Sequence, residues 1–321
     1  MEQRPRRMRP AHRARWRAVA ALWWVAAAGA MLGPRLSLGQ GKPGGSQPQL
    51  ISTDRLAELV AAGESLTLLD VRVSWVDYVQ NHLPGAQWAN VETFRAGEAG
   101  LPFQLLPWAS YRVLWSRLGV RRDRPVVVYS AGISLDKDAT FLVWLLAASG
   151  QPQVYLLDGG FAKWEAEGRP RTQTLPRFTV SEYSKGAFRP ETATLEDVRR
   201  AVERRDVLLV DARAAAQFQG QAGAQPRRGH IPGAVSHPLD DDLEHRDASL
   251  VWKPVESLRA AYEAQGITAD RDIIVYCNTS TEASHLFFAL RYLLGFPKVR
   301  IYLGSWTEWA ERQDLPIETG P

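Results

Sequence analysis

Short apolar runs alternate with longer segments in which apolar residues recur every three or four positions. The runs are rich in valine, isoleucine and leucine, as expected of strands buried on both faces of a parallel sheet. They read TLLDV, VVVYS and VYLLDG in the first half of the chain, and VLLVDA, IIVYC and VRIYLG in the second. The longer segments TDRLAELVAAG, TFLVWLLAASG, LEDVRRAVERR and SHLFFALRYLLG are predicted helices. The pattern predicts an α/β fold with mainly parallel sheets flanked by helices, and any site at the carboxyl ends of strands.

The chain contains an internal repeat. Four blocks of the first half return in the same order in the second half, and their spacing agrees: His82 precedes Ser130 by 48 positions, and His230 precedes Cys277 by 47. We therefore interpret the chain as a duplication of one domain, with a first copy at 50–172, a linker at 173–188 and a second copy at 189–317. The paired blocks are SLTLLDVR with DVLLVDAR, NHLPGA with GHIPGA, RDRPVVVYS with DRDIIVYC, and VYLLDGGFAKW with VRIYLGSWTEW.

Cys277 is the single cysteine of the chain, and it lies where the strand-like DIIVY breaks into a loop. One interpretation is a buried thiol used as a small apolar residue. The other is a reactive thiol, because successive loop amides and the start of a helix can stabilise an anion and so favour the thiolate. The first copy has Ser130 at the matching place, so only the second copy offers a thiol.

The N-terminal segment changes how the net charge of +4 is interpreted. Residues 1–30 hold seven arginines against Glu2 and carry +6, so the remaining chain carries −2 and shows no basic excess for nucleic acid. The apolar stretch AVAALWWVAAAGAML follows the arginines and precedes a Gly/Pro-rich segment. We interpret residues 1–39 as a signal peptide or N-terminal anchor and residues 40–49 as a tether. The protein is then exported, to the periplasm if the leader is cleaved, or anchored to the inner membrane if it is not.

The repeat resembles the tandem rhodanese family of sulfurtransferases over about Leu50 to Pro316. The resemblance rests on the D-x-R strand ends, the H-x-P-G-A blocks, the Cys277 loop, and the GGFAKW and GSWTEW ends. It implies two rhodanese-like domains with the catalytic cysteine in the second. It further implies that Cys277 takes a sulfane sulfur from thiosulfate or 3-mercaptopyruvate, holds it as a persulfide, and passes it to cyanide or a thiol. The resemblance implies no cofactor or metal. In an oxidising compartment the free thiol would need a reductant, such as a thiol reductant protein, or protection as the persulfide.

The loop after the cysteine is expected to cradle the persulfide with its backbone N–H groups. It departs from thiosulfate-type members, which often carry basic residues there, because it has none and ends on Glu282. A carboxylate near the sulfur opposes thiolate formation and repels a dianionic donor unless it points away, so the donor stays open. The expected cradle consists of Asn278, Thr279, Ser280, Thr281, Glu282 and Ala283.

Several further residues are candidates by position. In 3-mercaptopyruvate-type enzymes an Asp, a His and a loop hydroxyl are proposed to act together, and Asp70, His82 and Thr279 match those positions. Asp70 and His82 also have twins in the second copy, as residues that hold the fold would. In the family, donor-binding arginines fall shortly after the second D-x-R block; the first of these positions is Gln217 here, and Arg227 or Arg228 matches the second. Arg227 and Arg228 are also compatible with a solvated loop, and Arg213 is expected first as a structural partner of a nearby carboxylate. These candidates are Arg213, Gln217, Arg227 and Arg228.

Two other functions remain open from the sequence. The acidic loop is also compatible with a non-enzymatic sulfur carrier or binding module. A phosphatase on the same kind of sheet needs an arginine about six residues after the cysteine to hold phosphate, but that position is Ala283.

Overall fold

The computed structural model describes residues 47–98, 100–133, 137–177, 179–184 and 186–320. The predicted leader and most of the predicted tether lie outside these residues. The first strand, β1 (Gln49–Ile51), begins at the last residue assigned to the tether. None of the helices in the described ranges is long and apolar enough to cross a membrane.

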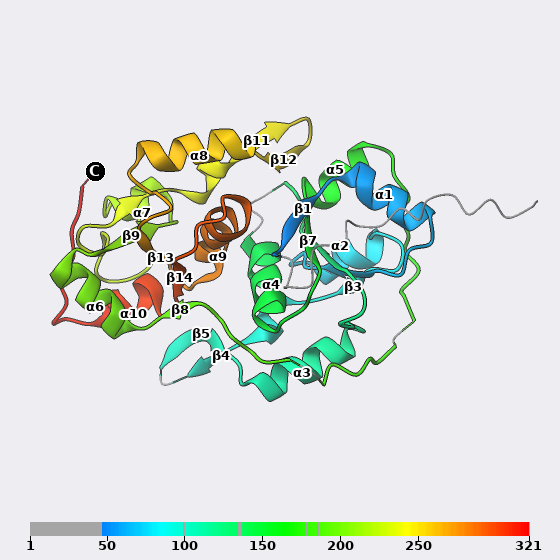
Figure 1. Cartoon of the computed structure of the whole chain (residues 1–321), viewed down its shortest axis with the longest axis horizontal. Coiled ribbons are helices and arrows are strands. Elements are labelled where there is room, and N and C mark those ends of the chain that lie inside the picture. Colours follow the sequence, from blue (N-terminus) through cyan, green and yellow to red (C-terminus); the bar gives the residue numbers. More distant parts are fainter. Residues whose placement is uncertain (1–46, 99, 134–136, 178, 185, 321) are drawn as a thin grey trace, which may run out of the picture. The chain divides into compact units, whose positions relative to one another are not determined.

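Two parallel five-stranded sheets form the framework of the described chain (Figure 1). The first has the order β1-β7-β6-β2-β3 and the second has the equivalent order β8-β14-β13-β9-β10. The repeated order confirms the predicted α/β fold and the duplication. The remaining strands of the first sheet are β2 (Thr67–Asp70), β3 (Gln87–Trp88), β6 (Val126–Tyr129) and β7 (Val154–Leu157), and those of the second are β8 (Thr192–Ala193), β9 (Val207–Asp211), β10 (Val235–Ser236), β13 (Asp272–Tyr276) and β14 (Val299–Tyr302).

Helices cover the sheets, and side chains fix where several of them begin. Ser52 caps α1 by accepting the N–H of Arg55, while Thr194 and Asp197 form a reciprocal capping box at the start of α6. The helices are α1 (Thr53–Ala61), α2 (Trp75–Gln80), α3 (Trp108–Arg117), α4 (Lys137–Ala148), α5 (Gly160–Ala166), α6 (Leu195–Arg204), α7 (Ala215–Phe218), α8 (Val255–Ala264), α9 (Thr281–Phe287) and α10 (Ser305–Glu311).

Shorter elements join these layers. Each copy carries an antiparallel hairpin after a 3-10 turn, at Val91–Phe94 in the first copy and at Leu239–Asp242 in the second. A π-helical stretch, Phe288–Leu293, continues α9. The hairpins are β4 (Arg95–Glu98) with β5 (Leu101–Leu105), and β11 (Leu243–Arg246) with β12 (Ser249–Trp252).

Helices α4 and α9 join the two copies through one continuous core. Helix α4 is buried nearly all round, as its uniformly apolar sequence TFLVWLLAA requires, and it packs against α9 of the second copy. The hydroxyl oxygens of Thr140 on α4 and Ser284 on α9 lie 3.0 Å apart in a buried hydrogen bond. Because α9 directly follows the Cys277 loop, the first copy supports the helix at which that loop ends.

Candidate active site

Cys277 lies at the carboxyl end of β13, in the loop between that strand and α9. Cys277 itself is only 1% exposed. Four residues of the same loop line a neighbouring cavity: Asn278, Thr279, Thr281 and Glu282. The loop bends sharply because Ser280 adopts a left-handed backbone with φ 71°, which turns the chain into the helix. The sulfur is thus buried, and the side chains of its own loop lie between it and the cavity.

Ser305 supports the cysteine loop through hydrogen bonds to its backbone. Its Oγ accepts the backbone N–H groups of Cys277, at 3.3 Å, and of Ser280, at 3.2 Å, and it donates to the carbonyl of Tyr302 at 2.7 Å. The next residue, Trp306, donates its N–H to the carbonyl of Cys277 at 2.8 Å. The GSW part of the repeated block thus fixes both ends of the loop, a role that the sequence did not reveal.

The first copy shows what this serine adds. The matching turn has Gly160 at φ 54°, where the second copy has Ser305 at φ 51°. In both turns the following N–H supports the loop, since Phe161 donates to the carbonyl of Ser130 at 2.9 Å. Left-handed backbone favours glycine, so a serine here is strained. The second copy tolerates this strain at the position whose hydroxyl supports the only thiol.

We expect Ser305→Gly to slow sulfur transfer about fivefold, because the two loop N–H groups lose a shared acceptor whose hydrogen bonds together contribute about 1 kcal/mol. Glycine suits the positive φ, so the fold should be retained and the free energy of unfolding should change little. The measurements are steady-state kcat and a denaturation curve for the same preparation. Unchanged kcat would show that the hydroxyl does not position the loop.

Opposing effects act on the Cys277 thiol. Burial and the negative charge of Glu282 raise its pKa to about 12, while hydrogen bonds from the backbone N–H groups of Ala283, Thr279 and Glu282 lower it. These three donors belong to the six residues that were expected to form the cradle. Burial and the nearby carboxylate favour the neutral form and outweigh these amides, so the pKa of the resting thiol lies above its usual range.

Glu282 faces the sulfur rather than pointing away. Burial raises the pKa of its carboxyl group, and the charge of Lys137 and a hydrogen-bonding interaction with the Cys277 thiol act in the opposite direction. Lys137 Nζ lies 3.8 Å from one carboxylate oxygen, Oε1. The other oxygen, Oε2, is buried and has no hydrogen-bond partner in the described part of the chain. The Glu282 carboxylate thus lies near the thiol, and its Oε2 atom can still accept a hydrogen bond.

The cavity beside the loop has a volume of about 370 Å³ and is formed by both copies. The second copy contributes the loop, while the first contributes Val73 and four charged residues. Neither Arg95 nor Lys137 was anticipated, and they supply the positive charges that the loop lacks. The charged residues from the first copy are Glu92, Arg95, Lys137 and Asp138.

Arg95 connects the first copy directly to the cysteine loop. Its guanidinium donates to the Thr281 hydroxyl, pairs with the Glu92 carboxylate, and lies 4.2 Å from the centre of the Phe103 ring. The Arg95 side chain is 7% exposed, so these contacts fix its position. Thr281 is the first residue of α9, and Arg95 therefore helps to hold the start of that helix.

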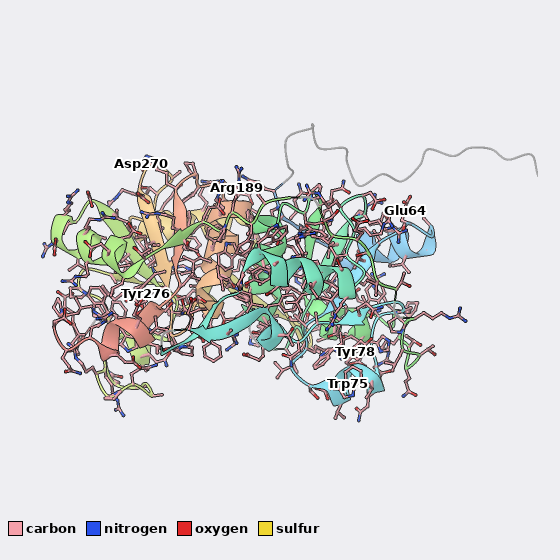
Figure 2. All side chains as sticks on the ribbon, turned by 90° about the horizontal axis from the view of Figure 1, so that it is seen from below. Glu64, Trp75, Tyr78, Arg189, Asp270 and Tyr276 are labelled. Carbon is pink, nitrogen blue, oxygen red and sulfur yellow. The ribbon has the colours of Figure 1, made fainter. Side chains whose placement is uncertain are left out.

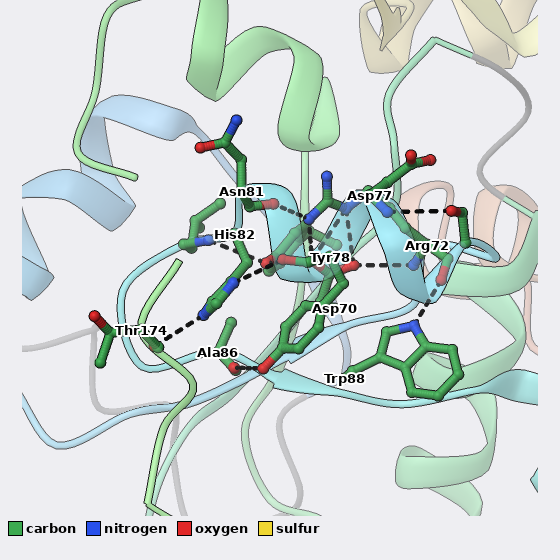
Figure 3. A network of polar contacts seen from close by, with 12 residues as sticks. Asp70, Arg72, Asp77, Tyr78, Asn81, His82, Ala86, Trp88 and Thr174 are labelled. Carbon is green, nitrogen blue, oxygen red and sulfur yellow. Dashed lines mark hydrogen bonds and ion pairs between the residues drawn. The ribbon is translucent and has the colours of Figure 1, made fainter. Parts of the chain in front are cut away.

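Asp70 and His82 take part in a network at the corner of the first sheet (Figure 3). Asp70 accepts hydrogen bonds from Arg72, at 2.7 Å, and from the Tyr129 hydroxyl, at 2.7 Å. His82 Nδ1 lies 2.8 Å from the carbonyl of Tyr78, and its Nε2 lies 3.2 Å from that of Thr174. Neither residue lines the cavity with Thr279. An assisting catalytic role for them stays a prediction, and their contacts are those of residues that hold the fold.

The other positional candidates also lie outside the residues that line the cavity. Arg213 repeats the first-copy pattern, since its Nη2 lies 2.6 Å from Asp211 and 2.7 Å from the carbonyl of Gly229. Arg227 donates to the carbonyls of Arg312 and Leu315. Arg228 is exposed and Gln217 is half-buried. Within the described ranges, no group of three or more His, Cys, Asp or Glu residues could hold a metal ion.

A model of the rhodanese-like domain matches the chain twice, over residues 52–167 and 194–312. The chain belongs to the rhodanese-like family. This confirms the resemblance seen in the sequence, and each match contains one of the two sheets except for its outermost strand, β1 or β8.

Curated relatives cover most of the chain. A Synechococcus elongatus protein provisionally named a thiosulfate sulfurtransferase is 36% identical over 80% of this chain and 81% of its own length. The sulfur carrier protein TtuD of Thermus thermophilus is 33% identical over 84% and 96%. The 3-mercaptopyruvate sulfurtransferase of Escherichia coli is 31% identical over 75% and 85%.

Solved structures share the fold. The crystal structure of YnjE superposes with a TM-score of 0.73 at 21% identity, covering 85% of this chain and 68% of that one. At this identity the likeness concerns the two-domain rhodanese fold alone.

Proposed function

We propose that Cys277 accepts a sulfane sulfur from a small donor, holds it as a persulfide and passes it to cyanide or a thiol. The chain is a sulfurtransferase of the rhodanese-like family. The observation that carries the residue assignment is the set of backbone N–H groups of Ala283, Thr279 and Glu282 around the Cys277 sulfur. Such donors stabilise the negative charge that a persulfide brings into the loop.

The transfer proceeds in two displacements at sulfur. The Cys277 thiolate attacks the outer sulfur of thiosulfate, whose S–S bond breaks and releases sulfite, or the sulfur of 3-mercaptopyruvate, whose C–S bond breaks. In the second case the carbon takes the proton of the donor thiol and pyruvate leaves. Cyanide or a thiolate then attacks the outer sulfur of the persulfide, and the electron pair returns to Cys277.

Charges in the cavity favour a monoanionic donor. Arg95 and Lys137 face three carboxyl groups, those of Glu92, Asp138 and Glu282. Burial raises the pKa of Asp138 and of Glu282. Thiosulfate, a dianion, meets more repulsion there than the single carboxylate of 3-mercaptopyruvate does.

We expect kcat/KM for 3-mercaptopyruvate to exceed that for thiosulfate about fivefold at low ionic strength, with a smaller ratio in high salt because salt screens the repulsion. Steady-state assays of both donors with cyanide as acceptor provide the measurement. A preference for thiosulfate would show that the positive charges of Arg95 and Lys137 outweigh the carboxylates of the cavity.

A second candidate is a sulfur carrier that loads Cys277 but turns over slowly with small acceptors. The similarity to a protein named as a sulfur carrier favours it, as does the carboxylate beside the thiol. A carrier would form the persulfide and release it to a protein, yet show negligible turnover with cyanide. Comparing single-turnover loading with steady-state turnover separates the two functions.

We also propose that the protein is exported to the periplasm and kept active there by a thiol reductant protein. The arginine-rich, apolar leader and the small residues at Ala28, Gly29 and Ala30 support this proposal. The test is the N-terminus of the protein recovered from each cell fraction. An intact leader in the membrane fraction would favour the anchored alternative, and an intact leader in the cytosol would contradict export.

A further inference from the structure

An exposed apolar surface extends outward from the mouth of the cavity, and the sulfur chemistry of Cys277 does not use it. Its residues are Val73, Trp75 and Val76, called the apolar rim, and they are 83%, 46% and 57% exposed. Val73 also lines the cavity together with Asn278 and Thr279. Figure 2 shows Trp75 on the outer side of α2, at the periphery of the molecule. The rim therefore begins at the site and leads away from it.

The neighbours of the rim hold it in position. The Trp75 ring lies 5.1 Å from that of Trp88 and 5.2 Å from that of Tyr78. Trp88 is fixed in turn, because its Nε1 donates to the carbonyl of Arg72 at 2.8 Å (Figure 3). Trp75 is thus presented to solvent by a rigid support, and little side-chain freedom remains to be lost on binding.

The duplication provides an internal comparison for this surface. The second copy has the same corner, with Arg213 paired to Asp211 and Phe218 stacked on His230 as Tyr78 stacks on His82 in the first copy. At the segment that matches the rim, however, it has exposed Ala214, Ala215 and Ala216. The fold therefore does not need large apolar side chains at this corner. They occur only in the first copy, whose Val73 lines the cavity with Asn278 and Thr279.

We propose that the apolar rim is the docking surface for a protein that takes sulfur from the Cys277 persulfide onto its own cysteine. This inference rests on the proposed function. Cyanide or a small thiol fits within the cavity and gains nothing from side chains outside it, whereas a protein loop that inserts a thiol must also cover the mouth. A rigid tryptophan with flanking valines is typical of the centre of a protein interface.

The transfer is an exchange between thiols. The partner's thiolate attacks the outer sulfur of the persulfide, the bond between the two sulfurs breaks, and Cys277 leaves as the thiolate. The partner then carries the persulfide. If the partner has a second cysteine, that thiol displaces hydrogen sulfide and closes a disulfide, so the electrons come from the partner's own dithiol.

The experiment measures discharge of a loaded enzyme. Cys277 is loaded with either donor, freed of it, and mixed with reduced thioredoxin as a protein dithiol or with dithiothreitol as a small one. Loss of about 32 Da, the mass of the transferred sulfur, follows the discharge. We expect Val76→Lys to lower the second-order rate constant with thioredoxin at least tenfold and to change that with dithiothreitol less than twofold. Val113→Lys is the matched control, because Val113 is an exposed valine on α3, 52% exposed, that does not line the cavity.

The outcomes are distinguishable. Discharge by thioredoxin that is equally fast in Val76→Lys and the wild type, or that is no faster than discharge by dithiothreitol, overturns the docking surface. Self-association of the wild type that Val76→Lys abolishes would assign the rim to a second copy of this chain and also overturns it. Failure of both donors to load Cys277 contradicts the proposed function itself, and the docking proposal then falls with it.

Discussion

Cys277→Ser is expected to reduce sulfur transfer by at least about a thousandfold, because a serine hydroxyl neither ionises near neutral pH nor forms a persulfide. The wild type incubated with either donor should gain about 32 Da, the mass of one sulfur atom, and the variant should gain nothing. Intact-protein mass spectrometry and steady-state turnover with cyanide are the two measurements. Both effects follow from the single thiol of the chain.

Ser130→Ala provides the matched control in the first copy, since Ser130 stands where the second copy has the cysteine. It should retain wild-type turnover and full loading. Residual turnover in Cys277→Ser above the uncatalysed rate would mean that another group carries the sulfur, and the proposed function would have to be abandoned.

Glu282→Gln is expected to accelerate sulfur loading at neutral pH by at least about tenfold, because each unit by which the thiol pKa falls increases the thiolate fraction tenfold. The Glu282 charge contributes to raising the pKa of Cys277 to about 12, so its removal lowers that pKa. Loading increases as the pH rises through the thiol pKa, and a lower pKa therefore shifts the profile toward acid. The single-turnover rate of persulfide formation, measured against pH, provides the check.

Lys137→Met should act in the opposite direction. Lys137 Nζ lies 3.8 Å from Glu282, and loss of this cation leaves the carboxylate charge less balanced, so the pH profile of loading should shift toward alkali.

Slower loading in Glu282→Gln than in the wild type would reverse the interpretation of the carboxylate. Glu282 would then serve as the acceptor of the thiol proton, and its negative charge would be an aid rather than an obstacle.

Local patterns were sufficient to predict the sheets and the position of the thiol. The short apolar runs of the first half correspond to β2, β6 and β7, and Cys277 directly follows β13. The edge strands β1, β3, β8 and β10 were missed, since two or three residues are too few to show a period.

Long-range packing explains what the sequence did not predict about the site. Arg95 and Lys137 are 182 and 140 positions before Cys277, and only the packing of β4 and α4 of the first copy beside the second copy's loop brings them to the cavity. The direction of the thiol pKa shift was left open by the sequence for the same reason. Amide donors could be inferred from the loop, whereas the burial that outweighs them depends on the assembled core.

The core shared by α4 and α9 restricts how this duplicated gene can change. The first copy has no thiol, and it would be dispensable for the chemistry only if the second copy folded by itself. Helix α4 of the first copy, however, is apolar on nearly every side and has Ser284 of the second copy as a hydrogen-bond partner. A chain cut between the halves would expose that helix to water and remove one wall of the cavity. Mutation could thus erase the chemistry of one half, but selection must keep both halves together in one polypeptide.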